Sequence, residues 1–189
     1  MHTIEPFWNW REYYIASHDK LSPFFGTKHS QFHFTHKIYN YLIHPQWDSF
    51  GSETLYCKIL FADYENRFAV IEFIGEWNDA IGNDIMNLKR RIIDPMIKRG
   101  IVQFILIGEN VLNFHASDDL YYEEWYDDIK EEGWIVALNF REHVADEMHR
   151  CKLHYYINIG GGYNQVEWRK FKPRDIPALM ENLIVKSLQ

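Results

Sequence analysis

The chain has 189 residues, of which 47% are hydrophobic, 25% charged and 17% aromatic, and its formal net charge is −7. The length suits about one domain, and the near-average composition excludes wholesale disorder. An acidic chain with no lysine- or arginine-rich run argues against a nucleic-acid-binding protein and against binding to an anionic membrane surface.

The sequence also indicates a cellular compartment. The first five residues lack the basic and then apolar pattern of a signal peptide. No apolar run approaches the roughly 18 residues of a membrane span. Cys57 and Cys151 are far apart and are read as free thiols in a reducing environment. We therefore expect a soluble, cytoplasmic protein.

Residues 1–50 are predicted to form an arm that differs from the rest of the chain. Trp8, Trp10, Trp47 and a group of histidines are interrupted by prolines and a glycine, and no long helical or strand period runs through them. One strand is expected around 37–43. Because large aromatic side chains gain free energy from burial, we expect the arm to pack on the main body with all three tryptophans largely buried.

From residue 54 onward the pattern becomes regular. Apolar runs of strand length follow one another, and the first two are joined by a short polar link that is typical of an antiparallel hairpin. The later runs are nearly continuous, as in strands covered on both faces of a parallel sheet. The predicted strands are 55–61, 68–74, 101–107, 134–138 and 154–159, with an edge strand near 166–171.

Amphipathic helices are predicted between these strands. Apolar residues at three- and four-residue steps define a first helix, capped by Asn78 or Asp79, bent by Pro95 and ended by Gly100. Ser117 is expected to cap a second helix over about 118–131. A third helix is predicted after the capping-box pattern at Asn139–Glu142. A fourth helix is expected to be capped by Asp175 and to end at about Leu188.

The sequence therefore predicts an α/β fold with a mixed, mostly parallel sheet, alternating helices and an aromatic-rich N-terminal arm. The arm occupies 1–50 and a single α/β domain occupies 51–189. In this prediction 68–74, 101–107, 134–138 and 154–159 are mutually parallel, and 55–61 is antiparallel to them.

The order of elements over about 55–160 resembles the STAS family of anti-sigma-factor-antagonist domains, and in particular its SpoIIAA-like branch. The text Phe73–Asn78 is similar to the family's apolar strand followed by glycine and a short link into the first helix. Phe104–Ile107 followed by Val111–Leu120 is similar to its second strand, loop and phosphoacceptor helix start. Trp134–Asn139, followed by a capped helix, is similar to its third strand and helix.

This resemblance implies a regulatory module that works by binding rather than by catalysis. Phosphorylated members carry Asp-Ser-Ser/Thr-Gly at the start of the second helix. The corresponding text here is Ala116–Asp119, which lacks the glycine, and Ser117 is the candidate phosphoacceptor.

A ligand site is expected at the carboxyl ends of the parallel strands, where ligands of open α/β sheets bind. Gly75 and Gly108 are each followed by a glutamate, and these carboxylates would approach closely if the strands are neighbours. They could then share a proton, bind a cation or be held apart by Arg141. They could equally point away from each other as solvated loop residues. The candidate ligand-binding residues are Glu76, Asn78, Glu109, Asn110, His115, Asn139, Arg141 and His143.

Other patterns carry weaker signals. The arm contains four histidines, His29, His33, His36 and His44. In a helix His29 and His33 would share a face, whereas the alternation over 31–36 favours a strand with His33 and His36 on opposite faces. Because these two interpretations conflict, no metal site is predicted. Three glycines at 160–162 indicate a flexible turn and not a phosphate loop. The acidic and aromatic run 121–128 is read as a helix with one core face and one solvated face, or as a protein-binding face.

Two functions are therefore carried forward. The first is a STAS-like binding or regulatory module that binds a protein partner or a small molecule, without catalysis, cofactor or metal. The second is a small enzyme or metal-binding protein with an acid and histidine site at the strand ends. A homodimer is among the assemblies considered, and no catalytic residue is assigned.

Overall fold

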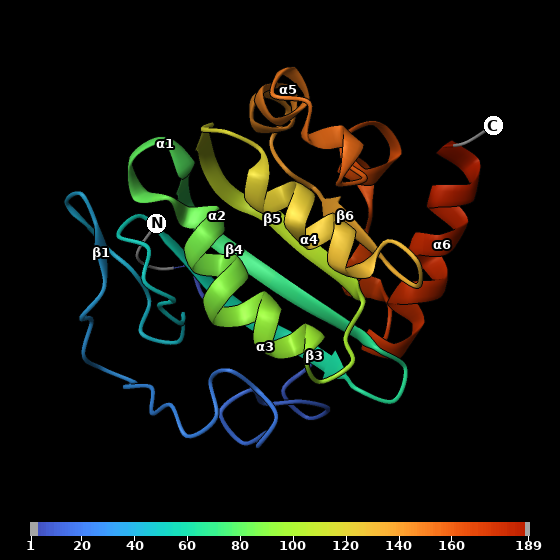
Figure 1. The fold of residues 1–189 in the computed structure, drawn as a ribbon. Coiled ribbons are helices and arrows are strands. Elements are labelled where there is room, and N and C mark those ends of the chain that lie inside the picture. The colour runs from blue at the N-terminus through green and yellow to red at the C-terminus, as the bar shows by residue number, and fades with distance from the viewer. Residues whose placement is uncertain (1–3, 188–189) are drawn as a thin grey trace.

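A computed structural model describes residues 4–187, and its centre is a four-stranded sheet. The strands are β3 (Leu55–Asp63), β4 (Phe68–Asn78), β5 (Gln103–His115) and β6 (Trp134–Leu138). They lie side by side in chain order, with β3 antiparallel to β4 and both later pairs parallel. The predicted hairpin and the parallel pairs that follow it are confirmed (Figure 1).

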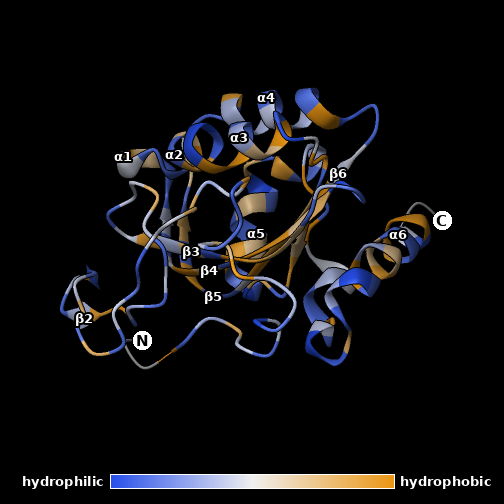
Figure 2. Cartoon of the chain, turned by 90° about the horizontal axis from the view of Figure 1, so that it is seen from below, coloured by the Kyte–Doolittle hydropathy of each residue, from blue (hydrophilic) through white to orange (hydrophobic). Residues whose placement is uncertain are grey.

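The sheet is covered on both faces. On one face, alternate strand residues pack with apolar side chains of the helices that follow β4, β5 and β6. On the other face, Val70, Ile105 and Val136 pack with Trp10, Trp168 and the last helix. Figure 2 shows this layering, with α1–α4 on one side of the sheet and the arm and α6 on the other. Burial on both faces explains why these strands are apolar at nearly every position.

The first predicted helix is broken into shorter pieces. They are α1 (Asp79–Gly82), α2 (Asp84–Leu88), a π-helical turn (Lys89–Ile93) and α3 (Asp94–Ile97). Asn83 separates the first two because its backbone is left-handed, with φ 50°. The apolar stripe from Ile85 to Met96 is buried as predicted, but Ile81 lies before the break and is 89% exposed.

The later helices are α4 (Leu120–Ile129), α5 (Glu142–Arg150) and α6 (Ile176–Ser187). Asp175, the predicted cap of α6, directly precedes that helix, but the predicted caps of α4 and α5 differ from the observed ones. Asp119, not Ser117, precedes α4, and Arg141, not Asn139, precedes α5. Asn139 instead has a left-handed backbone, and its side chain contacts other segments. The predicted end at Leu188 lies outside the described residues.

Two predicted strands are absent from residues 4–187. The segment 154–159 begins in a 3-10 helix (Leu153–Tyr155), and only Asn158 bridges β6, through Val136. Leu153 and Ile157 are buried, whereas Tyr155 between them is 63% exposed, so burial does not alternate as in a strand. The predicted edge strand 166–171 contains the 3-10 helix Trp168–Lys170. Further 3-10 helices span Gly161–Gln165 and Pro173–Asp175.

The arm packs on the body of the protein. It contains a small hairpin of β1 (Lys37–Ile38) and β2 (Tyr41–Leu42), where one strand was predicted. Trp10 and Trp47 are 4% and 0% exposed, as expected. The prediction is wrong for Trp8, which is 56% exposed and carries the Arg11 guanidinium 3.9 Å from its ring centroid.

Within residues 4–187, every helix is too short or too polar to cross a bilayer.

Candidate functional site

Gly75 and Gly108 do not begin loops as predicted, because β4 and β5 continue past them to Asn78 and His115. Gly75 has φ +122°, and a Cβ there would lie 2.1 Å from the Thr54 carbonyl oxygen. A Cβ on Gly108 would lie 2.3 Å from the Phe140 ring. Gly75 therefore permits a close approach of the Thr54 backbone, and Gly108 leaves room for the Phe140 ring.

Glu76 belongs to a small polar cluster beside the arm hairpin. Its carboxylate accepts hydrogen bonds from Tyr39 Oη at 2.7 Å and from Asn113 Nδ2 at 3.2 Å. His115 Nε2 lies 3.9 Å from it. Asn78 lies two residues further along β4 and caps α1 by accepting the backbone N–H of Ile81. The structure thus brings Glu76 and His115 together and joins them to the arm.

Glu109 lies in a second cluster with the C-terminal segment. Asn139 Nδ2 and Trp168 Nε1 each donate to it at 2.9 Å, and Arg169 pairs with it at 2.6 Å. Burial alone would raise the pKa of Glu109, but Arg169 and these donors hold it below its ordinary value. Glu109 and Asn139 meet as a structural joint between β5, the end of β6 and the segment at 166–169.

The remaining predicted residues are dispersed. Arg141 is exposed at the start of α5 and makes no salt bridge with a described residue. His143 Nε2 donates to the Leu112 carbonyl at 2.7 Å, which ties α5 to the end of β5. Asn110 is half-buried opposite Ile74, and Ser117 is exposed just before α4. The eight predicted residues therefore do not converge on one pocket.

Glu72 is a titratable group that sequence reasoning missed. It is 1% exposed, accepts the backbone N–H of Phe7 at 2.7 Å, and lies 3.8 Å from Arg169. Burial raises its pKa to about 7, against the opposing effects of the Phe7 hydrogen bond and Arg169. The available signal was a single acid inside the apolar run 68–74, because buried carboxylates are rare without partners.

A second buried acid, Asp79, organises the start of the helical layer. It accepts hydrogen bonds from Trp77 Nε1, from the backbone N–H of Ile85 and from Tyr122 Oη, the last at 2.6 Å. Burial raises its pKa to about 6, although these donors favour the ionised form. The network ties the end of β4, α2 and α4 together and has a structural role.

Tyr122→Phe is expected to lower the free energy of unfolding by about 1–2 kcal/mol, because it removes one donor from the buried Asp79. Chemical denaturation would measure the difference. Tyr121→Phe, on the same helix but half-buried, is the control and should change stability by less than about 0.5 kcal/mol. Equal effects of the two variants would contradict the structural role assigned to the Asp79 network.

Three carboxylates, from Asp94, Glu124 and Asp128, have oxygen atoms within 4.8 Å of one another, a spacing that would suit a metal ion. The ammonium of Lys89 lies among them. It pairs with Asp94, lies 2.7 Å from Asp128 and 3.5 Å from Glu124, and is itself fully buried. The chain therefore supplies its own cation at this position, and we assign the cluster to structure.

The arm histidines lie in neither the helix nor the strand considered above, because residues 28–36 are irregular. His29 Nε2 lies 2.5 Å from the buried Asp48, and Lys58 donates to the same carboxylate at 2.9 Å. His29, His33 and His36 line a cavity of about 370 Å³. Their ligand atoms form no close group of three among residues 4–187, so the geometry does not assemble a metal centre.

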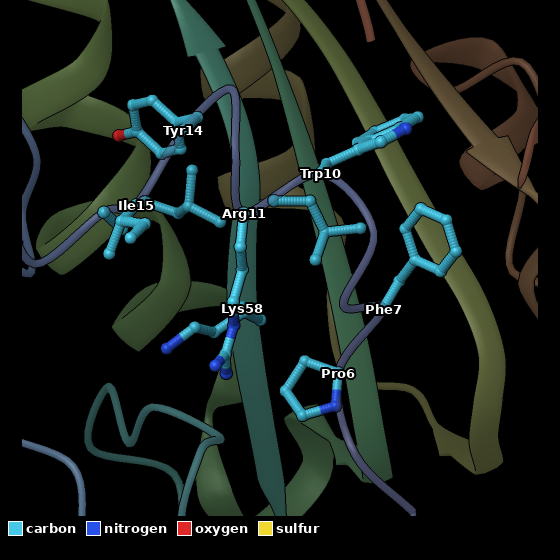
Figure 3. A pocket seen from close by; sticks show the side chains of 10 residues that line it. Pro6, Phe7, Trp10, Arg11, Tyr14, Ile15 and Lys58 are labelled. Atoms are coloured by element: carbon cyan, nitrogen blue, oxygen red, sulfur yellow. The ribbon is translucent and has the colours of Figure 1, made fainter. Parts of the chain in front are cut away.

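The beginning of the arm, residues 6–15, crosses the edge of the sheet. Figure 3 shows Phe7, Trp10 and Tyr14 spread along this crossing, with Lys58 beside Arg11. The enclosed space between them and β3 is about 30 Å³, which holds about one water molecule. The crossing is thus a packed joint and not a ligand site.

The hairpin β1–β2 has two unlike faces. Its inner residues Ile38 and Ile43 are 1% and 0% exposed and pack in a separate small core with Trp47, Tyr56 and Ile74. Its outer residues Tyr39, Tyr41 and Leu42 are 66%, 54% and 46% exposed. We call these three residues the hairpin surface. It projects at the side of the molecule opposite α6 (Figure 1).

Exposed apolar side chains are concentrated in the arm. Of the sixteen large hydrophobic side chains that are exposed among residues 4–187, eleven lie in residues 4–42. The stretch 20–47 also contains no acidic residue, although the whole chain has 27. Aromatic side chains and few acids are typical of the centre of protein interfaces.

The hairpin surface is therefore the best-supported candidate site. No protein-family model matches this sequence, and no curated protein matches it significantly.

Proposed function

We propose that this chain is a STAS-like binding module that works without catalysis and acts through a protein partner docked on the hairpin surface. The observation that carries the proposal is the concentration of exposed large hydrophobic side chains in the arm. Three of them, Tyr39, Tyr41 and Leu42, lie on a hairpin whose other face packs in a small core, so little order would have to be gained on binding.

The architecture supports the STAS-like part of the proposal. An antiparallel hairpin leads into parallel strands in chain order, and α2–α5 contribute to the core on one face of the sheet. This agrees with the predicted order of elements as far as α5, whereas the strand predicted at 154–159 is absent. Ser117 is exposed before α4, a position that a kinase could reach, and we retain it as the proposed phosphoacceptor.

The charge of the arm indicates the chemistry of the partner. The acid-free stretch 20–47 carries three lysines and four histidines in a protein of net charge −7. Its partner should therefore present an apolar surface rimmed by acidic side chains, since complementary charge favours encounter and selects the partner.

A paired set of triple variants tests the proposal. Tyr39→Ser, Tyr41→Ser and Leu42→Ser together should abolish stoichiometric co-purification of the partner. Ile81→Ser, Leu120→Ser and Val185→Ser together remove exposed apolar side chains elsewhere and should preserve it. Circular dichroism and tryptophan fluorescence would check that both proteins are folded. Retention of the partner by the hairpin variant would contradict the proposed surface.

A small enzyme is the second candidate, and Glu72 is the observation that favours it. A carboxyl whose pKa lies near 7 suits acid–base chemistry, and Glu109 and Arg169 lie close by. The site would differ from the predicted strand-end site, because Glu72 lies in the middle of β4 beneath the arm. Native mass spectrometry tests this candidate. A small molecule retained by the parent and lost in Glu109→Gln would favour it over the binding module.

A further inference from the structure

A large cavity elsewhere in the molecule has no role in the proposed partner surface. It measures about 910 Å³ and lies between the arm, the β3–β4 turn and the segment before α6. It is at the opposite end of the β3–β4 hairpin from Glu76, because its wall includes Asp63 and Tyr64. Its volume falls in the range of small-molecule sites.

Aromatic rings form much of the wall. Tyr13 and Tyr14 come from the arm, and Phe61 and Tyr64 come from the end of β3 and the following turn. The Tyr14 and Phe61 rings meet edge to face, 5.8 Å apart and inclined by 61°. Rings set at steep angles can surround one group from several directions, which a flat apolar wall cannot do.

The aromatic wall is held in place by one carboxylate. Tyr14 Oη and Tyr64 Oη both donate to Asp19 Oδ2, at 2.8 and 3.1 Å. The other oxygen of Asp19 accepts the backbone N–H of Leu21, a further wall residue, at 2.9 Å. The rings are thus positioned before any ligand arrives, which reduces the entropy lost on binding.

The charged wall residues carry an excess of negative charge. Glu12, Asp63, Glu65 and Asp175 oppose Lys172 and Arg174. Asp63 is 8% exposed and accepts hydrogen bonds from the turn, including Asn66 Nδ2 at 2.9 Å. Burial would raise its pKa, but the hydrogen bonds from Asn66 and the nearby Arg174 lower it, so the carboxylate is ionised at neutral pH.

We propose that this cavity binds a methylated ammonium group, held against the rings of Tyr13, Tyr14 and Tyr64 and neutralised by the surrounding carboxylates. A quaternary ammonium is weakly hydrated and cannot donate a hydrogen bond, so ring faces and diffuse negative charge are the surroundings that favour it. The group can come from a small quaternary amine or from a methylated lysine side chain of a protein. The site is independent of the hairpin surface.

Choline is the first probe, and 3,3-dimethyl-1-butanol is its neutral counterpart of the same shape. In an amide NMR titration of the full chain at constant ionic strength, choline should shift resonances of residues 12–14, 61–65, 172, 174 and 175. The neutral compound should bind at least about ten-fold more weakly, since only the cation gains the cation–π and charge terms.

Tyr13→Leu should weaken choline binding about ten-fold, because it removes the most exposed ring of the wall and keeps an apolar side chain. Tyr41→Leu on the hairpin surface is the matched control and should leave the affinity unchanged. A peptide with trimethyllysine is then compared with the same peptide carrying lysine. Tighter binding of the trimethyllysine peptide than of choline identifies a protein side chain as the source, and the reverse order identifies a small amine.

Three results would overturn the proposal. They are equal affinity for choline and its neutral counterpart, no shifts in the named residues, and binding of inorganic phosphate at those residues in place of choline. The last would mean that Lys172 and Arg174 dominate the cavity. Loss of partner binding by the hairpin variant would have no bearing on any of these results.

Discussion

Trp47→Ala is expected to lower the free energy of unfolding by about 3–5 kcal/mol, because it removes a fully buried aromatic side chain. Trp47 is the largest member of the small core that holds the hairpin against β3 and β4. Its indole N–H also donates to the Ile4 carbonyl at 2.8 Å, which fixes the beginning of the described chain. Urea denaturation followed by tryptophan fluorescence would measure the loss.

Trp8→Ala is the matched control, since Trp8 lies in the same arm but is 56% exposed. Its main partner is the Arg11 guanidinium, so its removal should cost less than about 1 kcal/mol. A small effect of Trp47→Ala, similar to that of Trp8→Ala, would show that the arm contributes little to the folded state.

The strands of the sheet could be predicted because their pattern depends on local sequence. The nearly continuous apolar runs at 68–74 and 101–107 predicted strands that are buried on both faces, and that burial is observed. The run 154–159, predicted as a strand from its tyrosines and isoleucines, is not a strand. Leu153 and Ile157 are buried while Tyr155 between them is 63% exposed, and a short run does not reveal that this burial departs from the alternation of a strand.

The tryptophans of the arm show what amino-acid composition alone cannot predict. Their number predicts that the arm packs, but not which rings are inside. Trp10 meets Trp168 edge to face, 5.3 Å apart, across 158 residues of sequence. Trp8 points to the other side of the same short segment and finds only Arg11. Contacts between segments far apart in the chain decide the difference, and local pattern does not contain them.

The candidate site was harder to predict for a similar reason. Glu76 and Glu109 follow identical dipeptides, and the sequence suggested that they meet. Strand register places Glu76 opposite Asn113 and leaves Glu109 to the C-terminal segment. Because Glu72 pairs with Ile107, the two glutamates are already out of register, and the register shifts after Glu72 and after Gly75 move them further apart; neither feature has a clear sequence signal.

Glu72 links the arm to the pH dependence of stability. The backbone N–H of Phe7 satisfies one of its oxygens, and the arm thereby covers a carboxyl in the middle of the sheet. The pKa in the folded state is about 7, against an ordinary value of 4.5. Folding therefore favours the protonated form. The contribution of protonated Glu72 to the free energy of unfolding is complete below pH 4.5 and is lost as the pH rises through about 7.

Glu72→Gln should remove most of this pH dependence. A pKa shift of this size corresponds to a fall of about 3 kcal/mol in the free energy of unfolding between pH 4.5 and pH 8. Glutamine keeps an oxygen that can accept the Phe7 N–H but carries no charge to bury. The variant should match the parent near pH 4.5 and exceed its free energy of unfolding by about 2–3 kcal/mol at pH 8.

Urea denaturation at a series of pH values would measure both curves. Some slope should persist in Glu72→Gln, because burial also raises the pKa of Asp79, to about 6, and that acid loses its own contribution over a lower range. Glu12→Gln, an exposed acid on the arm, is the control and should follow the parent at every pH. If Glu72→Gln instead destabilises the protein at pH 8, the charged form of Glu72 must be the one that the fold requires. Its pairing with Arg169 would then outweigh the cost of burial.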